Sequence, residues 1–138
     1  MKKKKVLIFE DEWATISGSF ELANIYAFNQ ELSFVIKTKS QDIHFKSWED
    51  EYEAIFIDIT LAKNTKYDGY NIIKKIIDEQ LFSPDKMVVL TGNSKIEEKL
   101  SEMGLNKIPF KILYKPIDFE NIADVLSELL HEKNSTKS

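Results

Sequence analysis

Short apolar runs alternate along the chain with segments whose apolar residues recur every three or four positions. Short runs bounded by turn residues are typical of strands buried on both faces, and the longer period is typical of amphipathic helices. The runs predict strands at residues 6–9, 33–37, 53–58, 86–91 and 111–114. The periodic segments predict helices at residues 13–29, 40–51, 70–81, 94–103 and 118–133.

This strict alternation of strand and helix predicts a fold of the α/β class. Short connections between the elements imply a parallel sheet with helices on both faces. Right-handed crossovers restrict the topology, and the flavodoxin-like order 2-1-3-4-5 is the common solution for a sheet of five strands. We therefore expect a doubly wound, three-layer (βα)5 domain over residues 1–133, followed by a disordered polar tail at 134–138.

Individual side chains predict which helix faces are buried and where the helices end. Gly104 is a natural stop after the fourth helix, and Asp118 is a natural cap before the last one. The first helix is expected to bury Ile16, Phe20, Ala23 and Ala27. The third is expected to bury Ile73, Ile76 and Ile77.

Composition limits the class of protein. A chain of 138 residues with 43 % hydrophobic content is sufficient for one domain with one core. It contains no cysteine, which excludes disulfides, zinc–thiolate sites and cysteine nucleophiles. No apolar run reaches the roughly 18 residues of a membrane-spanning helix, and residues 6–9 are too short for a signal-peptide core. We expect a cytoplasmic protein without membrane contact.

The charge of the chain argues against direct binding to nucleic acid. The net charge is −4, and every basic residue is a lysine. Arginine, whose planar fork suits bidentate contacts with phosphate and guanine, does not occur in the sequence. The run Lys2–Lys5 is interpreted as a solvated lead into the first strand.

Polar residues follow four of the five predicted strands. Because the carboxyl ends of parallel strands share one edge of the sheet, where ligands bind in open α/β sheets, we expect these residues to converge. Taken singly, each is also typical of an ordinary loop, cap or surface position. The residues, in order along the chain, are Glu10, Asp11 and Glu12, then Asp58, then Thr91 and Gly92, then Lys115.

The chemistry of this set predicts a metal site that receives a phosphoryl group. Clustered carboxylates favour a cation between them, and oxygen ligands select Mg²⁺, Mn²⁺ or Ca²⁺ over zinc or copper. Asp11 and Asp58 suit direct ligation, and Glu10 suits ligation through water. Lys115 would neutralise an incoming phosphoryl group and Thr91 would donate a hydrogen bond to it. A carboxylate can itself be the nucleophile and form an aspartyl phosphate.

The ordered set of motifs resembles the receiver domain of response regulators in two-component signalling. The resemblance covers about residues 4 to 132, and the set is specific although each motif alone is weak. The matching motifs are Val6-Leu7-Ile8-Phe9-Glu10-Asp11-Glu12, Ala54-Ile55-Phe56-Ile57-Asp58, Asp68-Gly69, Val89-Leu90-Thr91-Gly92 and Tyr114-Lys115-Pro116.

The resemblance implies a role for each matched residue. Asp58 would accept a phosphoryl group from a phosphohistidine on a sensor histidine kinase or phosphotransfer protein. Glu10, Asp11, Asp58 and the backbone carbonyl of Thr60 would hold Mg²⁺, with Mn²⁺ as an alternative.

Thr91 and Lys115 would bind the phosphoryl oxygens, and a shift of Thr91 would repack the surface around the fourth and fifth strands. The chain would therefore not be an enzyme beyond self-catalysed phosphoryl transfer to, and hydrolysis from, Asp58. No output domain is recognisable after the last predicted helix, so we expect the signal to reach a separate effector protein.

Two departures from the family pattern distinguish this chain. Glu10 replaces the commoner aspartate and lengthens one metal-binding arm. The aromatic residue that usually lies three positions before the lysine is replaced by Ile112, and Tyr114 follows on the same face of that strand.

The departure at Ile112 motivates the alternative of a receiver-like interaction module that does not switch by phosphorylation. A Mg²⁺-dependent phosphohydrolase resembling the haloacid dehalogenases would need Asp-x-Asp, but here the run is Asp58-Ile59-Thr60. A flavodoxin would need a phosphate loop rich in Ser, Thr and Gly after the first strand, where this chain has three acids.

Overall fold

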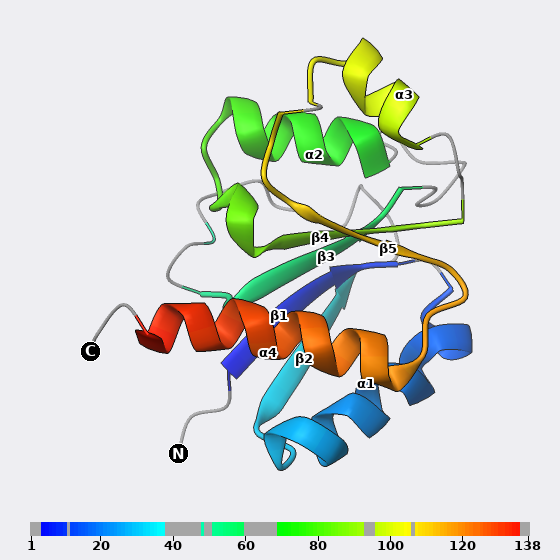
Figure 1. The fold of residues 1–138 in the computed structure, drawn as a ribbon, viewed down its shortest axis with the longest axis vertical. Coiled ribbons are helices and arrows are strands. Elements are labelled where there is room, and N and C mark those ends of the chain that lie inside the picture. Colours follow the sequence, from blue (N-terminus) through cyan, green and yellow to red (C-terminus); the bar gives the residue numbers. More distant parts are fainter. Residues whose placement is uncertain are drawn as a thin grey trace.

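The five predicted strands form one parallel sheet in the predicted order. A computed structural model describes residues 4–10, 12–37, 48, 51–59, 69–92, 96–105 and 107–135, with side chains described up to Leu130. The sheet order is β2-β1-β3-β4-β5, with every neighbouring pair parallel (Figure 1). The strands are β1 (Lys4–Phe9), β2 (Leu32–Lys37), β3 (Ala54–Asp58), β4 (Met87–Thr91) and β5 (Lys111–Tyr114).

The helices of the described residues cover both faces of this sheet, as the alternating pattern predicted. They are α1 (Trp13–Phe28), α2 (Gly69–Asp78), α3 (Ile96–Glu102) and α4 (Phe119–Ser135), with a short 3-10 turn η2 (Pro84–Lys86) before β4. The predicted helix at residues 40–51 lies largely outside the described residues. The predicted start of the fourth helix at Ser94 also lies outside them. The last helix runs two residues into the predicted polar tail.

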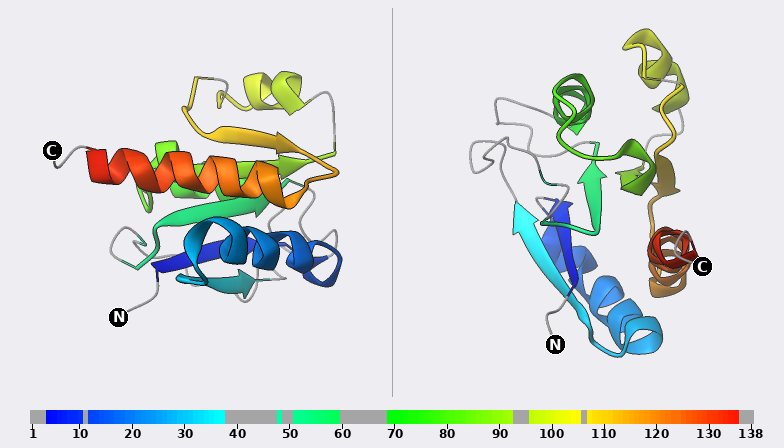
Figure 2. Two further views of the ribbon diagram at one scale, coloured as in Figure 1. Left: turned by 60° about the horizontal axis from the view of Figure 1, so that its bottom comes forward. Right: turned by 90° about the vertical axis from the view of Figure 1, so that its left-hand side faces the viewer.

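The alternation of side chains along each strand separates the core into two halves. In β1, Val6 and Ile8 point to the face covered by α1 and α4, while Leu7 and Phe9 point to the face covered by α2 and α3. Figure 2 shows these two helix pairs on opposite sides of the sheet. The central strands β1, β3 and β4 are buried on both faces at residues 6–9, 54–58 and 87–91, which explains why the sequence shows apolar runs there instead of alternation.

Aromatic rings anchor α1 close to the edge where the candidate site lies. The Phe20 ring packs edge-on against Phe56 of β3 at 5.1 Å and against Phe34 of β2 at 5.5 Å. Trp13, the first residue of α1, packs against Phe20 at 5.3 Å. On the opposite face the buried Trp48 lies 5.9 Å from the Phe9 ring. Phe9 directly precedes Glu10 in the chain.

The predicted inward faces of the helices are confirmed with one exception. Phe20 and Ala23 of α1 are buried and Ile16 is half-buried, but Ala27 is exposed, so its predicted burial is wrong. The helix ends one residue later, and the chain turns away at Asn29 in the left-handed region, so Phe28 contacts the core instead.

The predicted ends of the later helices are confirmed. Gly104 adopts φ +75°, a left-handed conformation that glycine takes without strain. At the start of α4 the Asp118 Oδ1 accepts a hydrogen bond from the Asn121 backbone N–H at 2.9 Å. The Asn121 Oδ1 in turn accepts one from the Asp118 N–H at 3.3 Å. No helix in the described part of the chain combines the length and the apolar character needed to span a bilayer.

The substitution Asp118→Ala is expected to lower the free energy of unfolding by about 1 kcal/mol, because it removes the acceptor for an end N–H of α4. Urea unfolding measures the change. Asp124→Ala on the exposed side of the same helix is the control and is expected to stay within about 0.5 kcal/mol of the parent. Equal losses in the two variants would contradict the capping role.

Candidate functional site

The carboxyl edge of the sheet brings together three of the predicted site residues. Glu10 follows β1, Asp58 ends β3 and Lys115 follows β5. Because Phe9 pairs with Ile57 in the parallel register, Glu10 and Asp58 occupy equivalent positions on neighbouring strands. Both carboxylates are withdrawn from solvent, with 0 % of Glu10 and 2 % of Asp58 exposed.

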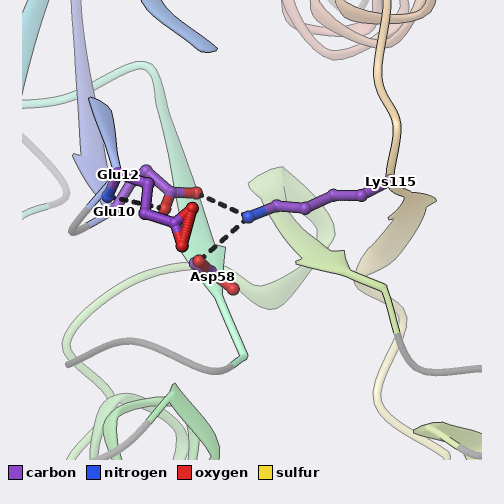
Figure 3. A network of polar contacts seen from close by, with 4 residues as sticks. All are labelled: Glu10, Glu12, Asp58 and Lys115. Atoms are coloured by element: carbon purple, nitrogen blue, oxygen red, sulfur yellow. Dashed lines mark hydrogen bonds and ion pairs between the residues drawn. The ribbon is translucent and has the colours of Figure 1, made fainter. Parts of the chain in front are cut away.

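Lys115 joins the two buried carboxylates across the edge of the sheet. Its Nζ lies 3.1 Å from Glu10 Oε2 and 3.1 Å from Asp58 Oδ2, while 26 % of its side chain is exposed (Figure 3). One ammonium therefore compensates charge on two acids at once. The side chain reaches the carboxylates from β5, on the far side of β4.

Backbone hydrogen bonds hold both ends of this bridge. The Lys115 N–H donates to the Thr91 carbonyl at 2.7 Å and continues the pairing of β5 with β4. The Glu10 N–H donates to the Lys37 carbonyl at 3.1 Å, and the Glu12 N–H donates to Glu10 Oε1 at 3.0 Å. The Lys115–Pro116 peptide is cis.

The electrostatics of the site favour a proton or a cation on Glu10. Burial raises the pKa of Glu10 to about 7, and its hydrogen bond with Asp58 and the charge of Asp58 act in the same direction. The Glu12 N–H and the Lys115 ammonium lower it. Burial alone would lower the pKa of Lys115, but the charges and hydrogen bonds of Asp58 and Glu10 raise it above its ordinary value.

Gly69 packs directly on the backbone that carries Asp58, a contact that sequence reasoning missed. A Cβ at this position would lie 2.5 Å from the Cα of Ile59 and would also clash with the carbonyl oxygen of Asp58. The first turn of α2 can approach the end of β3 only because residue 69 has no side chain. The Asp-Gly pair in the sequence was the available signal, but its steric reason required the fold.

Thr91 ends β4 and is fully buried. The other predicted participants, Asp11 and the carbonyl of Thr60, lie outside the described residues. Gly92 has open space beside its Cα. The roles assigned to all of these residues in catalysis and metal binding remain predictions.

The described donors fit a hard divalent cation. Glu10 and Asp58 supply carboxylate oxygens side by side, and Mg²⁺ typically takes one or two carboxylates together with water and phosphate oxygens. Among the residues that the structure describes, no set of three or more His, Cys, Asp or Glu side chains is arranged around one metal position. The two described carboxylates are hard oxygen donors, which suit Mg²⁺ better than zinc.

Comparison with known proteins identifies the fold. No family model and no curated protein matches the sequence. NtrX from Brucella abortus superimposes with a TM-score of 0.67 at 15 % identity, over 98 % of this chain and 28 % of its own. A two-component response regulator from Clostridium difficile superimposes with a TM-score of 0.66 at 19 % identity, over 96 % of this chain and 99 % of its own.

A third similar structure contains a metal. It is the receiver domain of the sensor histidine kinase PA1611 from Pseudomonas aeruginosa PAO1, with a magnesium ion coordinated in its active-site cleft. Its TM-score is 0.60 at 15 % identity, over 94 % of this chain and 98 % of its own. The chain described here has the fold of response-regulator receiver domains, and it spans about a quarter of the length of NtrX.

The substitution Gly69→Ala is expected to destabilise the protein by about 1–3 kcal/mol and to displace the backbone at Asp58, because the new Cβ clashes with main-chain atoms. Urea unfolding and the backbone amide shifts of Asp58 and Ile59 measure the two effects. Gly18→Ala is the control, since its Cβ would meet open space on an exposed helix. That variant is expected to gain up to about 1 kcal/mol. Similar stability of both variants would contradict the contact.

The substitution Lys115→Met is expected to raise the pKa of Glu10 above about 7 in the metal-free protein, because it removes a cation that favours the ionised carboxylate. A pH titration of the Glu10 carboxyl carbon by NMR measures the shift. Lys111→Met is the control, because this lysine pairs with Glu128 on the surface instead. An unchanged or lowered Glu10 pKa in Lys115→Met would contradict the assigned bridge.

Proposed function

We propose that this chain is a phosphoacceptor receiver domain in which Asp58 takes a phosphoryl group from a phosphohistidine. The observation that carries the proposal is the buried Asp58 carboxylate, 3.1 Å from the Lys115 ammonium and beside the buried Glu10. A carboxylate with a fixed cation at its oxygen is prepared to receive a dianionic group. The chain would be cytoplasmic, and its partners would be a sensor histidine kinase or phosphotransfer protein and an effector protein.

In the proposed transfer, an Asp58 Oδ atom attacks phosphorus while the phosphorus–nitrogen bond of the phosphohistidine breaks. The imidazole nitrogen keeps the electron pair of that bond, and the donor histidine leaves neutral because its other ring nitrogen carries a proton. The product is an acyl phosphate on Asp58, and water later releases it as inorganic phosphate. No further oxidant, reductant or co-substrate is required.

The chain's own residues would offset the charge that this transfer concentrates. Lys115, already 3.1 Å from Asp58 Oδ2, would neutralise a phosphoryl oxygen, and the Thr91 hydroxyl would donate a hydrogen bond to another. Glu10, Asp11, Asp58 and the Thr60 carbonyl would hold Mg²⁺, which supplies positive charge to the phosphoryl oxygens when bound. The magnesium in the PA1611 receiver domain supports the choice of metal.

The environment of Ile112 favours one second candidate, a receiver-like interaction module that does not switch. Ile112 is half-buried against the α2–α3 side of the core, where the family usually has an aromatic residue. Tyr114 pairs with Thr91 in the register and is 49 % exposed. Such a module would bind its partner with the same affinity with and without a phosphoryl mimic on Asp58; a large change in affinity would rule this candidate out.

Incubation with Mg²⁺ and acetyl phosphate is expected to add one phosphoryl group to the protein, detected by intact mass spectrometry. Asp58→Asn is expected to abolish the addition, because the amide is not a nucleophile of this kind. Asp85→Asn, at an exposed acid in η2, is the control and is expected to leave it unchanged. Addition that persists in folded Asp58→Asn, or no addition to the parent chain, would contradict the proposal.

A further inference from the structure

Strand β2 forms one edge of the sheet, and no other strand of the described residues pairs with its outer side (Figures 1 and 2). On its inner side it pairs with β1, and the Lys37 carbonyl accepts a hydrogen bond from the Glu10 N–H at 3.1 Å. The backbone groups of successive strand residues point to opposite sides. Counting back from Lys37, residues 33 and 35 therefore bond to β1. The N–H and C=O groups of Leu32, Phe34 and Ile36 point to the outer edge.

The Asn24 side chain of α1 occupies the first of these outward positions. Its Nδ2 donates to the Leu32 carbonyl at 3.0 Å, and its Oδ1 accepts from the Leu32 N–H at 3.1 Å. The amide therefore bonds Leu32 as a neighbouring strand would, which confirms the outward direction. Among the hydrogen bonds between described residues, none reaches the outward groups of Phe34 or Ile36. A strand edge with such groups is a template for pairing with another strand.

The side chains of β2 do not protect this edge. Proteins usually block a free edge with charges, proline or a bulge. From Leu32 to Ile36 the sequence has no charge and no proline, and the register with β1 runs through the strand without a bulge. Phe34, Val35 and Ile36 are only half-buried. Beside them lies a hollow of about 270 Å³, lined by Phe34 and by Ile25 of α1.

We infer that the outer edge of β2 pairs with β2 of a second copy of this chain, antiparallel and centred on Val35. Phe34 then lies opposite the second copy's Ile36, and the two residues exchange both of their backbone hydrogen bonds. The two-fold axis repeats this pair, so every outward N–H and C=O of Phe34 and Ile36 gains a partner. The two sheets become one continuous sheet, with α1 of both copies on the same face.

The side chains of β2 favour its own sequence as the pairing strand. The register sets Phe34 against the second copy's Ile36, an aromatic and a β-branched side chain, and sets Val35 against Val35 across the axis. The second copy's Ile36 would fill the hollow beside Ile25. Lys37 lies diagonal to the second copy's Glu31 on the same face, so opposite charges meet at both ends of the pairing.

A strand from a different protein would need to supply this same order of aromatic, β-branched and charged side chains. Antiparallel pairing of β2 with itself provides that order without a further requirement. The inference goes beyond the proposed function and does not depend on it, because it uses none of the side chains of Glu10, Asp58, Thr91 and Lys115.

Sedimentation equilibrium of the full chain, without Mg²⁺ or phosphodonor, tests the inference. Between about 10 µM and 1 mM we expect a reversible equilibrium between monomer and dimer. Amide hydrogen exchange over the same range identifies the interface. The amides of Phe34 and Ile36 are expected to exchange about tenfold more slowly in a mostly dimeric sample. The Val35 amide, which bonds to β1, is expected to change little.

A pair of charge variants tests the position of the axis. Val35→Lys and Val35→Glu each place like charges opposite one another, so each alone is expected to weaken dimerisation at least about tenfold. An equimolar mixture of the two is expected to form a mixed dimer, because opposite charges then meet. Ile36→Pro is a second route, since it removes an outward N–H without breaking the pairing with β1, and it is also expected to weaken dimerisation at least about tenfold.

Matched controls distinguish this interface from others. Tyr114→Lys places a lysine at an exposed position of β5, the opposite edge strand, and is expected to dimerise as the parent does. Asp58→Asn is also expected to dimerise normally, which separates failure here from failure of the proposed function. A chain that stays monomeric at about 1 mM would overturn the inference and leave the edge to a segment of a different protein. A dimer that survives in Val35→Lys but not in Tyr114→Lys, or one without slower exchange at Phe34 and Ile36, would also overturn it.

Discussion

The bridge from Lys115 to Glu10 and Asp58 is the interaction on which the candidate site depends. Two carboxylates with almost no exposure cannot both stay ionised side by side unless a cation compensates them, and here one ammonium lies 3.1 Å from each. Removing one partner of such a buried group typically costs roughly 3–5 kcal/mol, because the remaining charge is left unpaired. One ammonium cannot neutralise two ionised carboxylates, so the binding of a divalent cation or a phosphoryl group would change the charge balance at the site.

The sheet fixes the positions of these charged side chains. Glu10 and Asp58 follow paired residues of β1 and β3, so their separation is set by the strand register and not by a loop. Lys115 is fixed through its backbone bond to Thr91, and the contact of Gly69 with the Asp58 main chain closes the opposite side. Strands β1, β3, β4 and β5 therefore each fix one residue of the site at its carboxyl end. This is consistent with ligand binding at the carboxyl edge of open α/β sheets.

Much of this arrangement could be predicted from the sequence, for identifiable reasons. Apolar runs ending in Glu10, Asp58, Thr91 and Lys115 locate the strand ends, and the rule for parallel crossovers then brings those ends to one edge. What could not be predicted depends on contacts between distant segments. The steric demand at Gly69 and the raised pKa of Glu10 exist only once the strands are packed.

The most direct test of the central claim is an amide-resolved NMR titration of the whole chain, first with Mg²⁺ and then with beryllofluoride, which mimics a phosphoryl group. If Asp58 is the acceptor, Mg²⁺ will shift the amides next to Glu10 and Asp58. Beryllofluoride will then shift Thr91 and Lys115, and neither Thr91 nor Lys115 will respond to it in Asp58→Asn. A beryllofluoride response that needs no Mg²⁺, or one that is unchanged in Asp58→Asn, would contradict the assignment.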